Sequence, residues 1–323
     1  MPAASCCRSL TWNVKLLPSS MVQVMLQLAY RHDAAAMTSM SVARLLMIPL
    51  PFTIHCIVFH QLHKACQKAI LAPMTIGIYG LGRFGHFWAS TIRRMSPESV
   101  RVVATSRSWH EPPEGVDFLT EDDFLSSVDV LFFTVAISSF EEVLKRVADR
   151  VRKDTLVLDT CSVKAEPARW MEEKLDSSIQ LVASHPMFGP DSAKDGLAGL
   201  PMVLCPLRVD DDKFSWLNDL FTSWGLKVLV MTPLQHDRQA AYSQGVTHFV
   251  GRTLREMGLE DTEIATRGYK ALMSIVEQTC NDPMQLFYDL QHYNPYAREM
   301  RLSLQVALEK TLNHLRESEE GKV

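Results

Sequence analysis

A glycine-rich hexapeptide constrains the fold of this chain most strongly. Residues 75–79 form a short apolar run, and Gly80, Gly82 and Gly85 follow it before the helical pattern of residues 84–95. Glycines at this spacing permit a tight turn and let the backbone approach a pyrophosphate at a helix N-terminus. The spacing alone is a weak signal, but its position between a strand and a helix predicts a dinucleotide-binding unit.

Alternating strand and helix patterns continue from Met74 to about residue 232. The predicted strands cover residues 75–79, 100–105, 128–135, 155–159, 181–184, 201–205 and 227–231. The predicted helices between them cover residues 84–95, 122–127, 139–151, 166–175 and 214–224. This alternation predicts an α/β fold, a mostly parallel sheet with helices on both faces. We therefore expect a Rossmann-type dinucleotide-binding domain over residues 74–232.

Only helical patterns follow residue 232. They cover residues 235–257, 262–279, 283–290 and 295–316. We therefore expect an all-helical domain over residues 233–317.

Residues 1–73 differ in composition from the rest of the chain. They contain six Lys or Arg residues but a single acidic residue, Asp33. Their apolar stretch, residues 45–59, is interrupted by prolines and is too short for a transmembrane helix. We expect this segment to be unstructured, either as an extension upstream of the true start or as an organellar transit peptide. The expected location is the cytoplasm, or a plastid if the segment is a transit peptide.

Charge and cysteine content exclude several classes of function. A net charge of −4 over 323 residues gives no reason to expect a nucleic acid or an anionic membrane as partner. Beyond residue 73 the cysteines are scattered without CxxC spacing, so neither a zinc site nor a disulfide framework is predicted. We expect no metal.

The end of the second predicted strand bears on the choice of nicotinamide cofactor. NAD sites usually place an acidic residue there for the ribose 2′-hydroxyl, but this chain has Ser106 and Arg107. Arg can grip a 2′-phosphate with two hydrogen bonds and Ser can add another, which favours NADP over NAD. The alternative is a solvated arginine on a loop. The expected cofactor-binding residues are Gly80, Gly82, Arg83, Phe84, Gly85, Ser106, Arg107 and Thr134.

Three further segments occur in a recognisable order. They are Asp159-Thr160-Cys161-Ser162-Val163-Lys164, His185-Pro186-Met187-Phe188-Gly189-Pro190, and Gln235-His236-Asp237 followed by Ser243-Gln244-Gly245-Val246-Thr247-His248. With the Ser-Arg-Ser at 106–108 and the late Tyr293-Asn294-Pro295, they resemble the prephenate/arogenate dehydrogenase family, its plant-type arogenate dehydrogenases above all. The resemblance extends over roughly residues 75–316.

The resemblance implies a fold, a reaction and an assembly. The fold is a dinucleotide-binding domain followed by a helical domain that joins two subunits as a homodimer. The small-molecule substrate is arogenate, which gives tyrosine, or prephenate, which gives 4-hydroxyphenylpyruvate. A hydride passes to the nicotinamide, the ring hydroxyl loses its proton, and carbon dioxide leaves as the ring becomes aromatic. This chemistry needs one base at the hydroxyl.

The resemblance also assigns two residues to catalysis. His185 matches the family's catalytic histidine, and a neutral imidazole can accept a hydroxyl proton near pH 7. Ser162 matches a serine that hydrogen-bonds the same hydroxyl region and orients the histidine. Without the other motifs His185 could be a loop histidine, and Ser162 could be a helix N-cap.

Other matched positions lie nearer the helical domain. His248 matches a substrate-side histidine, and Gln244, one turn earlier, can share its face. For His236 and Asp237, at the domain junction, capping or gating is favoured over chemistry. Lys164 could attract the dicarboxylate substrate or be solvated. No arginine for the substrate carboxylates matches with certainty, so the candidates are Arg252, Arg267 and Lys270.

Asp282 bears on the choice between the two substrates. Arogenate carries an ammonium group where prephenate carries a keto group, so a carboxylate near that group selects arogenate. Asp282 matches an acidic position that accompanies arogenate preference in plant-type relatives. The alternative is an N-cap ahead of Pro283.

Two other functions are compatible with parts of the pattern. A β-hydroxyacid dehydrogenase or imine reductase shares the two-domain plan, but places a catalytic Lys or Asp where this chain has Gln244 and His248. A non-catalytic NADP-binding redox sensor would have no need for Ser162, His185 and His248 together.

Overall fold

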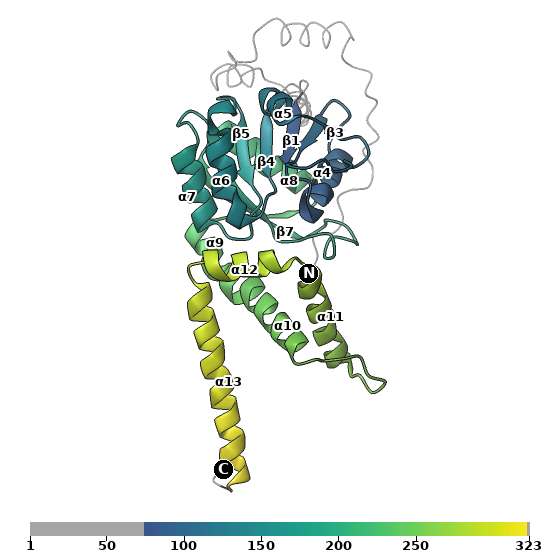
Figure 1. The fold of residues 1–323 in the computed structure, drawn as a ribbon, viewed down its shortest axis with the longest axis vertical. Coiled ribbons are helices and arrows are strands. Elements are labelled where there is room, and N and C mark those ends of the chain that lie inside the picture. The colour runs from purple at the N-terminus through teal and green to yellow at the C-terminus, as the bar shows by residue number, and fades with distance from the viewer. Residues whose placement is uncertain (1–73, 322–323) are drawn as a thin grey trace, which may run out of the picture. The chain divides into compact units, whose positions relative to one another are not determined.

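The computed structural model describes residues 74–321, and the expectations for residues 1–73 lie outside this part of the chain. Eight strands form one sheet in the order β3-β2-β1-β4-β5-β6-β7-β8 (Figure 1). The strands are β1 (Thr75–Tyr79), β2 (Arg101–Thr105), β3 (Asp117–Phe118), β4 (Val130–Phe133), β5 (Leu156–Asp159), β6 (Gln180–Pro186), β7 (Pro201–Arg208) and β8 (Lys227–Val230). All neighbours are parallel except β6 and β7. The predicted α/β class is confirmed, although β3 was missed because two residues carry no alternation pattern.

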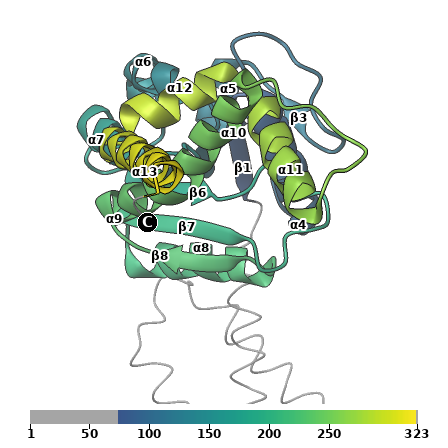
Figure 2. The same ribbon diagram turned by 90° about the horizontal axis from the view of Figure 1, so that it is seen from below.

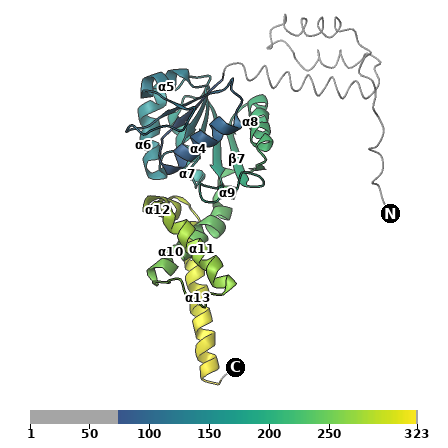
Figure 3. The same cartoon turned by 90° about the vertical axis from the view of Figure 1, so that its right-hand side faces the viewer.

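Helices cover both faces of the sheet, as Figure 3 shows. The helices of this part are α4 (Arg83–Met95), α5 (Glu121–Ser127), α6 (Ile137–Val147), the 3₁₀-helix η2 (Ala148–Arg150), α7 (Ala165–Lys174) and α8 (Asp211–Ser223). Adjacent residues of β4 point to opposite faces, as the pleat requires. Phe132 contacts Trp88 of α4, and Phe133 contacts Phe140 of α6. Both faces of the strand are fully buried, which explains its uninterrupted apolar sequence.

The carboxyl ends of the central parallel strands lie side by side. Tyr79, the last residue of β1, pairs with Thr105 and with Phe133, and Phe133 pairs with Asp159. Strand β1 lies between β2 and β4, so the chain order reverses there. Ligands of such sheets bind at this edge, beside the reversal point. The segments that follow these strands carry most of the predicted site residues.

Helices alone make up the chain after β8 (Figures 1 and 2). They are α9 (Pro233–Ala240), the π-helical turn η3 (Ala241–Gly245), α10 (Val246–Glu256), α11 (Arg267–Asn281), α12 (Met284–Tyr293) and α13 (Ala297–Glu319). The predicted regular helix over 235–257 was therefore wrong at the π turn, a feature often found at functional sites. None of the helices in residues 74–321 has the length and apolar character of a membrane span.

Two carboxylates of the helical segment cap helices of the sheet segment. Asp237 of α9 accepts hydrogen bonds from the backbone N–H groups of Lys164 (2.7 Å) and Ala165 (2.9 Å) at the start of α7. Asp289 of α12 accepts one from the N–H of Ser138 (3.1 Å) in the first turn of α6. Neither helix has a side-chain cap from its own N-cap residue. Acceptors at helix N-termini are stabilising, so these contacts fix how the two segments meet.

Candidate active site

The glycine-rich loop has the shape that a dinucleotide phosphate requires. Gly80 has a φ of +113°, a backbone conformation that residues with a side chain rarely adopt. A Cβ atom on Gly85 would collide with the Gly80 carbonyl oxygen. Gly82 is the N-cap of α4, offers no side-chain cap and faces open space. The first turn of α4 has no acidic residue. Its N–H groups are therefore available to a phosphate, and these residues fit a bound dinucleotide.

Three other predicted cofactor-binding residues, Thr134, Phe84 and Arg83, lie in or next to this loop. Thr134 donates from Oγ1 to the carbonyl oxygen of Gly80 (2.6 Å), so its hydroxyl supports the loop. The ring of Phe84 packs against Trp88. The guanidinium of Arg83 contacts Asp191 (2.6 Å) and Asp282 (3.2 Å).

Ser106 and Arg107 follow β2 at the same edge of the sheet. Ser106 is partly exposed and Arg107 is exposed. Among residues 74–321, neither side chain has a hydrogen bond or ion pair. Both side chains are therefore free to contact a ligand beyond the end of β2.

His185 lies near the end of β6 and is almost fully buried, with 2% of its surface exposed. Its Nδ1 lies 2.8 Å from Nε2 of His236. Burial, and next the nearby His236 and Lys164, hold the pKa of His185 well below its usual range. The imidazole is therefore neutral near pH 7, the form that can accept a proton.

Ser162 lies in the segment that follows β5, next to β6. It is partly buried, and its hydroxyl has no hydrogen-bond partner in the described residues. The N-cap of α7 is Lys164. The alternative that Ser162 caps this helix is therefore wrong, and its hydroxyl is available to a ligand.

Lys164 does not face solvent. Its ammonium and the carboxylate of Asp159 are both fully buried and form an ion pair. The ammonium also donates to the carbonyl oxygen of Ser184 (2.6 Å) on β6. The interpretation of Lys164 as a solvated residue was therefore wrong, because this lysine joins the ends of β5 and β6 beneath the site.

His236 and Asp237, at the start of α9, have different contacts. Asp237 caps a helix, whereas His236 contacts His185. Capping was predicted, and Asp237 confirms it at the N-terminus of α7. The contact of His236 with His185 was not predicted. These residues are 51 positions apart in the chain, and only the family motifs gave a reason to consider them together.

Gln244 and His248 present polar atoms without partners. Oε1 of Gln244 and Nδ1 of His248 are buried and form no hydrogen bond. Burial, and next the charge of Arg252, lower the pKa of His248 to about 4. His248 is therefore neutral near pH 7, and its 3.8 Å contact with Asp282 is not an ion pair at that pH. Buried polar atoms without a partner in the protein usually form hydrogen bonds with a ligand or with water.

Asp282 links the helical segment to the glycine-rich loop. It is the C-cap of α11, whereas the N-cap of α12 is Pro283, so the N-cap interpretation was wrong. Its carboxylate contacts Arg83 and lies near His248. Burial raises its pKa, and Arg83 opposes that shift.

The candidate carboxylate-binding residues differ in position. Arg252 donates to the carbonyl oxygens of Thr279 (3.0 Å) and Asp282 (2.7 Å), so it supports the backbone at Asp282. Arg267 and Lys270 are exposed at the opposite end of α11. At about 1.5 Å per residue, the 15-residue helix α11 separates its two ends by roughly 22 Å. The structure therefore does not bring Arg267 and Lys270 to Asp282.

Two family models and two plant relatives match this chain. The model "Prephenate dehydrogenase, nucleotide-binding domain" matches residues 98–230, and "TYRAAT1-like, C-terminal domain" matches residues 253–323. The chain is similar to Arogenate dehydrogenase 2, chloroplastic, of Arabidopsis thaliana, with 33% identity over 79% of this chain and 73% of the relative. It is 36% identical to Arogenate dehydrogenase 1, chloroplastic, of the same plant, over 75% of this chain but only 39% of that relative.

Solved structures share the fold. One is prephenate dehydrogenase from A. aeolicus in complex with hydroxyphenyl propionate and NAD+, with a TM-score of 0.58 and 22% identity. The match covers 77% of this chain and 93% of that one. Another is the Synechocystis arogenate dehydrogenase, with a TM-score of 0.57 and 19% identity over 76% of this chain and 93% of that one.

Proposed function

Because the chain belongs to the prephenate/arogenate dehydrogenase family, we propose that it catalyses the oxidative decarboxylation of arogenate with NADP. The observation that carries this proposal is the buried, neutral side chain of His185. It lies at the same edge of the sheet as the glycine-rich loop. A neutral imidazole in a site sheltered from water is suited to accept a proton from a substrate hydroxyl.

The chain's residues divide the work of this reaction. A bound NADP supplies the hydride acceptor. His185 accepts the proton of the ring hydroxyl, and Ser162, whose hydroxyl has no partner within residues 74–321, orients that group. Gln244 and His248 supply buried polar atoms for the remainder of the substrate. Carbon dioxide then leaves because the ring becomes aromatic, which needs no further residue.

The test is turnover of arogenate and of prephenate, followed by absorbance of the reduced nicotinamide. We expect turnover by the unmodified protein and a fall in kcat of about 10²–10⁴-fold in His185→Asn. Binding of NADP should not change, since His185 lies outside the glycine-rich loop. Near-native kcat in this variant would contradict the assignment, and absence of turnover of both substrates by the unmodified protein would contradict the function.

The proposed preference for NADP rests on Ser106 and Arg107. Among residues 74–321 neither side chain has a hydrogen bond or ion pair, and neither is acidic. In Arg107→Asp, the new carboxylate should repel the 2′-phosphate and weaken NADP binding by about 10–100-fold, the worth of one charge-assisted hydrogen bond. Arg101→Asp, at the exposed amino end of β2, is a control that also removes an ion pair with Asp117. Equal kcat/KM for NAD and NADP in the unmodified protein would contradict this preference.

The proposed preference for arogenate rests on Asp282. Its carboxylate lies near His248 and takes no part in a helix N-cap. A charge-assisted hydrogen bond contributes about 1.5–3 kcal/mol, so Asp282→Asn should lower kcat/KM for arogenate by about 10–100-fold and raise it for prephenate. Asp261→Asn, on an exposed loop, is the control. An unchanged ratio of the two substrates would leave Asp282 with a structural role alone.

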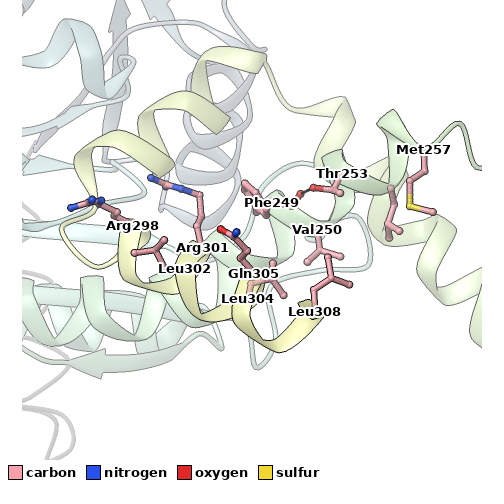
Figure 4. Close-up of a pocket in the computed structure, with 11 residues that line it drawn as sticks. Phe249, Val250, Thr253, Met257, Arg298, Arg301, Leu302, Leu304, Gln305 and Leu308 are labelled. Carbon is pink, nitrogen blue, oxygen red and sulfur yellow. Dashed lines mark hydrogen bonds between the residues drawn. The ribbon is translucent and has the colours of Figure 1, made fainter. Parts of the chain in front are cut away.

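A second copy of the chain is the proposed partner of α13. Leu302, Leu308 and Leu312 of this helix are about half exposed or more. An apolar groove of about 810 Å³ lies between α10 and α13, with Phe249 and Val250 on one side and leucines of α13 on the other (Figure 4). Exposed apolar side chains beside an apolar groove are typical of an interface. Leu308→Glu should convert a dimer to a monomer in light scattering, whereas Lys310→Glu should not.

We also propose the division into domains at residues 74–232 and 233–317 and a plastid location. The last strand ends at Val230 and α9 begins at Pro233, which supports the boundary. The chloroplastic names of the two plant relatives favour a plastid over the cytoplasm. Fusion of residues 1–73 to a fluorescent protein tests the location, and cytoplasmic fluorescence would contradict it.

A further inference from the structure

A buried chain of hydrogen bonds leads away from His185. Nδ1 of His185 lies 2.8 Å from Nε2 of His236, and Nδ1 of His236 lies 2.8 Å from Oδ1 of Asp237. The exposed fractions are 2% for both histidines and zero for Asp237. His185 comes from β6, whereas His236 and Asp237 come from α9. The chain therefore crosses from the sheet to the helical segment.

The contacts of Asp237 set the direction of this chain. Its two carboxylate oxygens accept hydrogen bonds from the backbone N–H groups of Lys164 and Ala165, and these groups can only donate. Asp237 therefore acts as an acceptor, and the Nδ1 of His236 must donate to it. Neutral imidazole carries one proton, so Nε2 of His236 is an acceptor. Nδ1 of His185 must then carry the proton of His185, and its Nε2 holds the free lone pair.

We propose that His236 and Asp237 are positioning residues that hold His185 in the Nδ1-protonated tautomer, with Nε2 as the base. The tautomer itself does not depend on the proposed function, whereas the role of Nε2 as the base rests on that function. The tautomer of a histidine is set by the hydrogen bond of its other nitrogen. When Nε2 of His185 accepts the hydroxyl proton, the Nδ1–H bond to His236 stabilises the imidazolium. The wrong tautomer in a comparable chain costs up to about 10⁴-fold in rate.

Burial supports this arrangement by keeping both rings neutral. Burial lowers the pKa of His185 and of His236, although the hydrogen bond to Asp237 opposes the shift in His236. Two neutral rings leave a single proton between Nδ1 of His185 and Nε2 of His236. The direction of that hydrogen bond therefore follows from Asp237 alone.

The tautomer can be measured without turnover. Long-range ¹H–¹⁵N correlation spectra of protein labelled with ¹⁵N-histidine distinguish a protonated from an unprotonated ring nitrogen, and His185→Asn identifies the His185 signals. We expect a protonated Nδ1 and an unprotonated Nε2 in the unmodified protein. A protonated Nε2 on neutral His185 would overturn the proposal, whether or not arogenate or prephenate is turned over.

Substitutions of His236 test the catalytic consequence. His236→Phe keeps a ring but cannot accept a hydrogen bond, so kcat should fall about 10²-fold or more while KM and NADP affinity stay within about threefold. His236→Gln can accept from Nδ1 of His185, so it should restore the tautomer and most of kcat. His314→Phe, on the exposed part of α13, is the control.

Each outcome for His236 separates positioning from packing. Near-native kcat in His236→Phe would overturn the proposal, and so would equal losses in the Phe and Gln variants. If His236→Phe does not fold, the Gln variant and the spectrum of the unmodified protein still decide. If the unmodified protein turns over neither substrate, the proposed function fails, while the spectrum still tests the tautomer.

Discussion

The ion pair between Lys164 and Asp159 lies beneath the site with both side chains fully buried. Replacement of Lys164 by Met removes the ammonium and keeps a side chain of similar length. The carboxylate of Asp159 then retains only the N–H groups of Cys161 (3.0 Å) and Ser184 (3.0 Å). A buried charge without its partner is strongly unfavourable in a protein interior.

The expected loss is large relative to the stability of a typical domain. Removing one partner of a buried pair costs about 3–5 kcal/mol, against a total of about 5–15 kcal/mol. For chains of this size 1 kcal/mol lowers Tm by roughly 2–4 °C, so Lys164→Met should lower Tm by roughly 6–20 °C. Lys174→Met, in the last turn of α7, removes only partly exposed ion pairs and should lower Tm by at most about 4 °C.

Thermal unfolding followed by circular dichroism measures both variants. The double variant Asp159→Asn with Lys164→Met should recover more than half of the loss, because it leaves no buried charge unpaired. A Tm for Lys164→Met equal to that of Lys174→Met, together with a raised KM, would refute this reasoning. It would instead indicate that Lys164 attracts the substrate.

Three further predictions follow from the structure. A chain beginning at Met74 should fold and have full activity, because β1 begins at Thr75; an insoluble or inactive product would show that residues 1–73 are structural. Asp289→Ala should lower the free energy of unfolding by about 1–2 kcal/mol in urea titrations, because it removes the cap of α6; no change would contradict that role. His248 has a pKa of about 4 in the folded protein, below its ordinary 6.5. As the pH falls, the unfolded state therefore binds a proton at His248 before the folded state does. The contribution of His248 to the free energy of unfolding should therefore be complete above pH 6.5 and be lost between pH 6.5 and 4, by up to about 1.4 kcal/mol per pH unit. His248→Gln should show a shallower decline, and an equal decline would contradict the cause.

The glycine-rich loop and the order of elements were predictable because their causes are local. A φ of +113° at Gly80 and the close approach at Gly85 require glycine whatever surrounds them. Strand and helix periodicities likewise depend on which faces are buried. The π turn over Ala241–Gly245 was not predicted, and its Gly245 carbonyl oxygen accepts a hydrogen bond from Gln291, 46 residues later.

The sequence by itself determined which residues carry reactive groups and that the carboxyl ends of parallel strands would gather them. Only the tertiary structure decided which of these groups touch. Asp237 caps a helix 73 residues earlier, and His236 meets a histidine 51 residues earlier. Lys164, five residues after Asp159, turned inward to pair with it and with a strand 20 residues later. Such contacts depend on how the helical segment packs against the sheet, and the spacing of residues along the chain does not contain that information.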